Sequence, residues 1–245
     1  MSVMLFEERV HKFEYKLNDT DDQIIEYIID NKKEVIQSTI QRIANDLYTV
    51  PNTIMRLSKK LDYDGFSHLK NSLKSELEQG EVMVQNDIYH HIQKTFDLLD
   101  NEMIMTVAKL LKESRIVLFF AVGDSSDLCK MMVRNMRVSA KRTEFYPHRH
   151  EMLHRIEEMG KNDVLFLISL TGSTPLVLEM AKRAKERGVQ IISLTHFSRN
   201  PLQALTNVKL FCYSPHRELK GYNITDHTPA MIVLQALSQN YWKHY

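Results

Sequence analysis

The sequence predicts an α/β protein, in which an all-α N-terminal domain precedes a doubly wound parallel sheet. In residues 1–78, apolar positions recur at helical spacing. In residues 116–213, short apolar runs alternate with amphipathic stretches, as in parallel strands covered by helices on both faces. Two of these apolar runs lead directly into loops rich in hydroxyl groups, which is typical of a ligand-binding edge of such a sheet.

The N-terminal segments carry clear helix boundaries. Residues 18–22 form an Asn- and Asp-rich helix start, and isoleucines follow at helical spacing. Ser38 or Thr39 caps the next helix. After a break at residues 48–50, Pro51 suits the first position of a third helix. Residues 66–77 form a further amphipathic helix.

Residues 39–61 have the layout of a helix-turn-helix, with a short turn between two helices. Asn and Arg side chains on the second helix are suited to read adenine and guanine, while lysines pair with phosphates. The candidate DNA-binding residues are Asn52, Thr53, Arg56, Lys59, Lys60, Arg42 and Lys70. The alternative is that these residues only form the solvated face of a three-helix unit.

Between the two domains, residues 79–112 are polar and helical in pattern, with Gly80 as the predicted hinge. We expect an N-terminal domain over residues 1–78, a helical linker over 79–100 and an α/β domain over 101–245. The predicted strands and the last helix are residues 116–122, 143–147, 164–169, 189–195, 208–213 and 226–243.

The segment after the third apolar run concentrates hydroxyl groups. Ser169, Thr171, Ser173 and Thr174 lie between a strand and a helix that begins near Pro175. Unpaired backbone N–H groups and the positive end of the helix dipole make such a turn suitable for phosphate. The turn has no lysine of the P-loop type, which argues against a nucleoside triphosphate.

A similar loop follows the first apolar run. There, Gly123-Asp124-Ser125-Ser126 precedes a helical stretch, and Ser125 is the candidate phosphate-facing hydroxyl. Asp124 is unfavourable beside a phosphate unless its carboxylate faces another part of the ligand. Both loops could be ordinary helix caps, because Ser and Thr are favoured there. Their occurrence at two strand-to-helix transitions about 45 residues apart favours a shared binding site.

The two loops resemble the phosphosugar-binding SIS domain, which has a flavodoxin-like fold. The S-x-[ST]-G-x-T pattern at residues 169–174 carries the resemblance, together with the loop at residues 121–125, where Ala121 replaces the usual glycine. Residues 17–77 resemble the helix-turn-helix domain of RpiR-type bacterial transcription regulators, which join this domain to a C-terminal SIS domain. The matching segments are residues 17–28, 39–44, 53–61 and 65–70.

This resemblance implies a regulator, with repression as the expected action, of sugar or amino-sugar metabolism genes. Its implied partners are an operator in double-stranded DNA, a phosphorylated sugar effector and further copies of itself in a homodimer or homotetramer. No cofactor, metal or membrane partner is expected. Departures occur at Tyr48, Val50 and Asp62 around the second helix, which bear on its angle, and at Gln235, where an acid is frequent.

The alternative is a phosphosugar isomerase whose helical domain mediates assembly. Aldose–ketose isomerisation needs a base, and the candidates are Glu151, Glu179, His148, His150 and His227. No acid–base pair stands out, so we expect no enzyme activity. The cluster of His148, Arg149, His150 and His154 is a weak metal signal, because no cysteine or carboxylate completes it. A third possibility, raised by Asp124, is a regulator with a non-phosphorylated ligand.

The composition agrees with a cytoplasmic globular protein. The formal net charge is +1, so charge alone does not favour nucleic acid. No apolar run approaches the roughly 20 residues of a membrane span, and the N-terminus does not resemble a signal peptide. Cys129 and Cys212 are expected to be buried free thiols.

Overall fold

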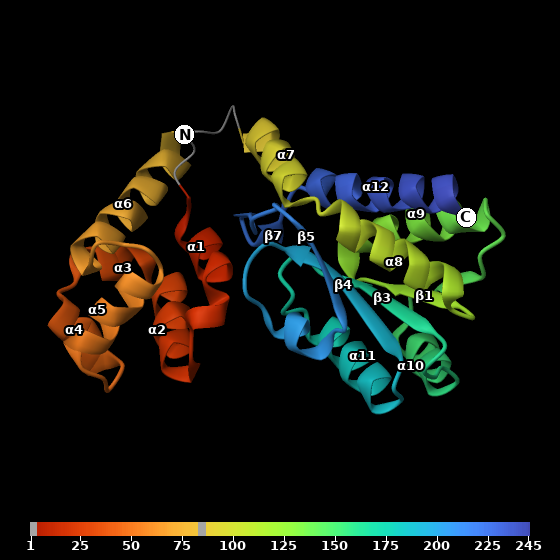
Figure 1. Cartoon of the computed structure of the whole chain (residues 1–245), viewed down its shortest axis with the longest axis horizontal. Helices are drawn as coiled ribbons and strands as arrows, with labels where there is room; N and C mark the ends of the chain where they lie inside the picture. Colours follow the sequence, from red (N-terminus) through yellow and green to blue (C-terminus); the bar gives the residue numbers. More distant parts are fainter. Residues whose placement is uncertain (1–3, 83–86) are drawn as a thin grey trace. The chain divides into compact units, whose positions relative to one another are not determined.

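The computed structural model describes residues 4–82 and 87–245 of the chain (Figure 1). The chain divides into two compact units, Met1–Asp87 and Ile88–Tyr245, each with its own hydrophobic core. In the described residues no helix combines the length and apolar character needed to cross a membrane.

The first unit is entirely helical, as predicted. Its helices are α1 (Phe6–Lys12), α2 (Asp19–Asp30), α3 (Lys32–Gln37), α4 (Ile40–Asp46), α5 (Pro51–Lys60) and α6 (Phe66–Val82), with a 3₁₀ turn at Glu14–Lys16. Asn18 and Asp21 form a reciprocal capping box at the start of α2, each side chain accepting the other's backbone N–H at 3.0 Å. Thr39, rather than Ser38, caps α4 through a 3.3 Å bond from the Arg42 amide.

Helices α4 and α5 form the helix-turn-helix. Two positions after the last residue of each helix, the backbone adopts a left-handed conformation. Tyr48 has φ 50° and Asp62 has φ 63°, at positions where glycine adopts this conformation more easily. The amides that follow return to carbonyl groups one turn back, from Thr49 to Ala44 at 2.8 Å and from Tyr63 to Ser58 at 3.0 Å. Val50 occupies the N-cap position of α5 and its side chain makes no capping bond.

The sequence patterns did not predict helix α1, which contacts the residues that follow the C-terminal end of α5. The Arg9 guanidinium donates to the carbonyl oxygens of Leu61 and Asp62 at 3.2 and 3.0 Å, and it lies 4.5 Å from the centre of the Tyr63 ring. The Phe6 amide donates to Glu76 of α6 at 2.7 Å, and burial raises the pKa of the Glu76 carboxyl. These contacts fix the orientation of α5 despite the unusual residue at position 62.

The second unit contains a parallel five-stranded sheet in the order β2-β1-β3-β4-β5. Its strands are β1 (Val117–Phe120), β2 (Thr143–Phe145), β3 (Val164–Ile168), β4 (Gln190–His196) and β5 (Val208–Cys212). Its helices are α7 (Asp87–Leu98), α8 (Asn101–Glu113), α9 (Ser126–Arg137), α10 (Arg149–Glu157), α11 (Pro175–Glu186) and α12 (Thr228–His244), with 3₁₀ turns at Gly123–Ser125 and Pro201–Leu205.

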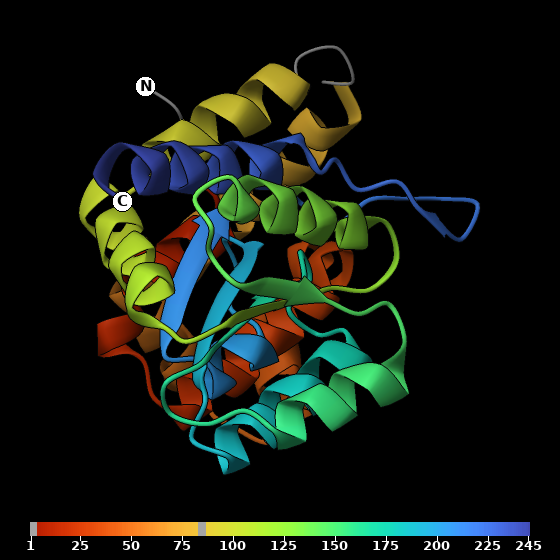
Figure 2. The same cartoon turned by 90° about the vertical axis from the view of Figure 1, so that its right-hand side faces the viewer.

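Helices cover both faces of this sheet (Figure 2). Residues 117, 119, 164, 166 and 168 point to one side and pack against α8, α9 and α12. Residues 118, 120, 165 and 167 alternate to the other side and pack against α10 and α11. The doubly wound sheet and all five predicted strands are therefore confirmed, with ends shifted by one or two residues.

Some segments depart from the expected outline. Between β5 and α12 the chain forms a small antiparallel hairpin, β6 (Glu218–Leu219) and β7 (Tyr222–Asn223), that the sequence patterns did not predict. Within the expected linker, residues 83–86 lie outside the described part, α6 continues to Val82, and α7 belongs to the second unit. There the Thr95 hydroxyl accepts the Tyr213 amide at 3.0 Å. Cys129 and Cys212 are buried, which raises the pKa of both thiols.

Candidate functional site

The two hydroxyl loops meet at the point where the sheet changes winding direction. Strands β1 and β3 are direct neighbours, with Phe120 opposite Leu167 at their carboxyl ends. Helix α9 leaves β1 for one face of the sheet, and α11 leaves β3 for the other. Their loops therefore border the crevice in which open α/β sheets bind ligands.

In the loop after β3, the candidate hydroxyls differ in exposure and in their partners. Ser169 is only 3% exposed, and its hydroxyl lies 2.9 Å from that of Thr174. Thr171 and Ser173 are exposed and are linked by a long 3.4 Å bond from the Ser173 amide to the Thr171 hydroxyl. Thr174 occupies the N-cap of α11, but its side chain makes no capping bond. The first amides of α11 thus remain available to an anion.

Gly172 is required for the shape of this loop. Its φ of 62° is a left-handed conformation, and a Cβ atom there would lie 2.1 Å from the side chain of Asn200. The Asn200 amide group is itself fixed by a 3.2 Å bond to the hydroxyl of Thr195 on β4. Any larger residue would therefore displace either the loop or the side chain of Asn200.

The loop after β1 is a 3₁₀ turn that leads directly into α9. Gly123 has φ 63°, Asp124 is exposed, and Ser125 is 9% exposed. The Ser125 hydroxyl lies 3.0 Å from Nε2 of His227, which immediately precedes α12. The sequence offers His227 only as a candidate base, since a separation of 102 positions along the chain gives no sign of this contact.

Among the other base candidates, Glu151 is half-buried on α10, Glu179 is engaged in an ion pair, and His148 and His150 are exposed. Glu179 forms an ion pair with Arg149, whose Nε lies 2.9 Å from the carboxylate, and this hydrogen bond lowers the Glu179 pKa. The rings of His148 and His150 stack at 5.7 Å, and both residues are exposed. In the described ranges, no group of three His, Cys, Asp or Glu residues could hold a metal ion.

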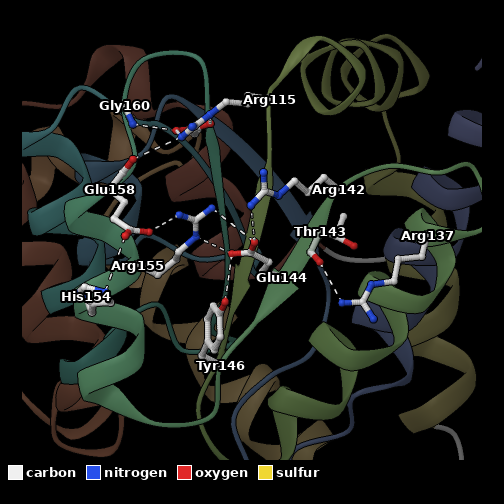
Figure 3. A network of polar contacts seen from close by, with 11 residues as sticks. Arg115, Arg137, Arg142, Thr143, Glu144, Tyr146, His154, Arg155, Glu158 and Gly160 are labelled. Atoms are coloured by element: carbon white, nitrogen blue, oxygen red, sulfur yellow. Dashed lines mark hydrogen bonds and ion pairs between the residues drawn. The ribbon is translucent and has the colours of Figure 1, made fainter.

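A second polar cluster contains arginines that acidic residues already neutralise (Figure 3). Arg115, before β1, forms a two-bond ion pair with Asp163, before β3, at 2.9 and 2.7 Å. Burial acts to raise the Asp163 pKa, but the bonds from Arg115 and from the Gly160 amide lower it overall. On the edge strand β2, Glu144 accepts a 2.6 Å bond from Arg155. This cluster stabilises the amino ends and edge of the sheet and leaves little net charge for an anionic ligand.

The predicted DNA-binding residues in the first unit differ in exposure and in whether neighbouring groups already bind them. Asn52, Arg56 and Lys59 are exposed on α5, and Thr53 is half-buried. Neither Arg56 nor Lys59 forms an ion pair with any other residue in the described part of the chain.

The remaining three cations contact neighbouring groups. Lys60 lies 2.5 Å from the carboxylate of buried Asp21, and Lys70 donates to the Ser38 carbonyl at 2.7 Å. Arg42 pairs with exposed Glu34 at 2.7 Å. Lys60 and Lys70 thus help to hold the helices together, while the exposed Arg42 pair is open to competition by phosphate.

Comparison with known proteins assigns both units. Residues 4–80 match the helix-turn-helix domain of the rpiR family, and residues 109–238 match the SIS domain. The transcriptional regulator GlvR of Bacillus subtilis is 27% identical over 256 residues, which cover 97% of this chain and 95% of that protein.

Solved structures share the fold. The NanR protein of Vibrio vulnificus, complexed with ManNAc-6P, has a TM-score of 0.64 at 22% identity, and the match covers 97% of this chain and 91% of that one. The sugar isomerase domain of the RpiR transcription factor from Sphaerobacter thermophilus has a TM-score of 0.58 at 16% identity. That match covers 66% of this chain and 89% of that one.

Proposed function

Because the chain belongs to the rpiR family of helix-turn-helix transcription regulators that carry a SIS domain, we propose that a phosphorylated sugar or amino sugar controls its DNA binding. The observation that carries this proposal is the pair of hydroxyl loops at the β1–β3 switch point. The similarity to NanR, which was solved with ManNAc-6P, supports the same class of ligand.

In the effector site, the anion would lie between the two loops. The hydroxyls of Ser169, Thr171, Ser173 and Thr174 would bind it together with the open amides at the start of α11. Ser125 would approach it from the β1 side. Asp124, exposed at the rim, would accept hydrogen bonds from sugar hydroxyl or amino groups, and the segment containing His148 and His150 would contribute to sugar selectivity.

In the DNA site, the exposed face of α5 would enter the major groove. Asn52, Thr53 and Arg56 would contact base edges, whereas Lys59 and Arg42 would contact phosphates. Lys60 and Lys70 would act mainly by fixing the helices. A homodimer or homotetramer would place two such helices one DNA turn apart on a near-palindromic operator in the cytoplasm.

We propose further that the protein acts as a repressor and not as an isomerase. Of the base candidates, Glu179 is held in an ion pair with Arg149, and Nε2 of His227 lies within hydrogen-bond distance of the Ser125 hydroxyl. An isomerase remains the alternative, since a SIS domain serves both roles and the similar Sphaerobacter domain is described as a sugar isomerase domain.

Selection of tight binders from a random duplex DNA pool tests the proposal, at about 150 mM salt so that nonspecific phosphate attraction is weak. A palindromic motif whose binding weakens about 5–150-fold with one sugar phosphate supports it, since this is the usual range of allosteric coupling. No selected motif, combined with conversion of fructose or glucosamine phosphates by the purified protein, would favour the isomerase instead.

A further inference from the structure

The residue that precedes α12, His227, contacts the loop after β1 through its side chain. Nε2 of His227 lies 3.0 Å from the hydroxyl of Ser125, the candidate hydroxyl in the loop after β1. Ser125 is 9% exposed, so few solvent molecules compete for this bond. The pair therefore joins two segments that lie on the same side of the sheet, the beginning of α9 and the beginning of α12.

The backbone around His227 is fixed on both sides. Oδ1 of Asp226 accepts the Thr228 amide at 2.9 Å, and the Asp226 carbonyl accepts a hydrogen bond from the Ser214 hydroxyl. The His227 carbonyl accepts the Met231 amide at 3.0 Å in the first turn of α12. Because these bonds hold the turn, the imidazole is held close to Ser125 before any ligand binds.

The hydrogen-bond capacity of the two groups limits how they can meet an anion. A serine hydroxyl donates one hydrogen bond, and a neutral imidazole has one donating and one accepting nitrogen. If Ser125 donates to Nε2, its only proton is used and it presents lone pairs to the ligand. If Nε2–H donates to Ser125, the serine proton is free to bind an anion, which is a pure acceptor.

We propose that His227 is a positioning residue of the effector site, which donates from Nε2 to Ser125 and thereby makes the Ser125 hydroxyl a donor to the phosphate group. This inference rests on the proposed function. It also links ligand binding to α12, since a phosphate bound by Ser125 is connected to this helix through the bond between Ser125 and His227. Helix α12 packs along α8 and α9. The bond therefore connects the effector site directly to this layer of helices in the second unit.

Calorimetric titration with ManNAc-6P and with inorganic phosphate tests this role. We compare wild-type protein with His227→Leu, His227→Gln, Ser125→Ala and the His227→Leu/Ser125→Ala double variant. His227→Leu should weaken binding about tenfold, because the Ser125 hydroxyl loses the bond that orients it and its own bond to the charged phosphate weakens. His227→Gln should restore most of the affinity, because its side-chain amide can still donate. The double variant should bind as weakly as Ser125→Ala alone, since His227 acts through Ser125.

The tautomer of His227 supplies a second readout. If His227 had only a structural role, ligand binding would not change this tautomer. Long-range ¹H–¹⁵N spectra of the histidine rings should show the Nε2–H form of His227 once either probe is bound, with His227→Gln identifying the signal. Unchanged affinity of a folded His227→Leu variant, or additive losses from the two single variants, would overturn the inference alone. Failure of wild-type protein to bind or respond to any sugar phosphate would instead overturn the proposed function, and this inference with it.

Discussion

In the helical unit the candidate cations lie on helix surfaces where neighbouring residues compete for them, whereas in the α/β unit the sheet gathers the candidate hydroxyls at one edge. Lys60 contacts Asp21 and Lys70 contacts the Ser38 carbonyl, while Lys59 on the same helix as Lys60 is exposed. By contrast, the loops at residues 121–125 and 169–174 follow adjacent parallel strands.

This difference shows where sequence motifs predict the placement of residues. Parallel topology forces loops after neighbouring strands to the same edge, so a hydroxyl pattern there identifies a candidate site before any contact is known. A basic residue on a helix carries no comparable constraint. Its role depends on whether a carboxylate from a distant part of the chain lies within reach.

The largest expected effect concerns the gathered hydroxyls. Ser169→Ala combined with Thr171→Ala should weaken sugar-phosphate binding about 100-fold or more, since each hydrogen bond to a charged group contributes about 1.5–3 kcal/mol. Operator affinity without effector should stay within about twofold. Calorimetry and DNA titration measure the two quantities, with Thr106→Ala on α8 as the control hydroxyl. A double variant that responds to the sugar phosphate like wild type would break the assignment of this edge.

The next effect concerns a free cation of the helical unit. Arg56→Ala should cost about 1–3 kcal/mol in binding to the selected operator if the guanidinium reads a base. Competition with random duplex DNA distinguishes the roles. An equal loss on random DNA would show that Arg56 contacts phosphate and does not specify sequence.

Lys59 and Lys60 provide a matched pair that sharpens the comparison. Lys60→Met should lower the free energy of unfolding by about 1–2 kcal/mol, because buried Asp21 loses its partner. Lys59→Met should leave stability nearly unchanged and reduce the salt slope of DNA binding by about 1. Denaturant unfolding and salt-dependent DNA titrations measure the two effects. The reverse pattern would show that exposure does not separate binding cations from structural ones here.

The smallest effect concerns the turn between α4 and α5. Tyr48→Gly should stabilise the protein by about 0.5–1 kcal/mol, because Tyr48 has φ 50° and its side chain is 99% exposed. Asp62→Gly, at φ 63°, should give less, since it removes the 3.7 Å ion pair with Arg9. Chemical unfolding of both variants tests this order. A larger gain in stability from Asp62→Gly than from Tyr48→Gly would mean that the ion pair between Arg9 and the Asp62 carboxylate does not stabilise the protein.

Much of the fold followed from local patterns. The five apolar runs became the five strands, and the helix start at Asn18 became a capping box, because periodicity and capping depend on nearby residues. Helix α1 was not predicted, although Phe6 and Val10 are buried in the core. Its role depends on the contacts of Arg9 with residues 61–63, which lie more than 50 positions away.

The sequence was sufficient to predict which loops form the candidate site, but not which side chains contact each other. The hydroxyl pattern located both loops, and Ser125 and Ser169 lie buried at the predicted edge. The contact between Ser125 and His227, and the one between Lys60 and Asp21, are set by tertiary packing. No spacing rule connects residues 102 or 39 positions apart, so these partners could be found only in the folded chain.

The most direct test of the account is a titration of the protein onto the selected operator, with and without saturating sugar phosphate, for wild type and the Ser169→Ala/Thr171→Ala variant. The account predicts that one sugar phosphate shifts wild-type DNA affinity about 5–150-fold and does not shift that of the variant, although both bind the operator equally well without it. A sugar phosphate that shifts both proteins equally would contradict the hydroxyl-loop site. Absence of any shift in wild type across the sugar phosphates would contradict phosphosugar control itself.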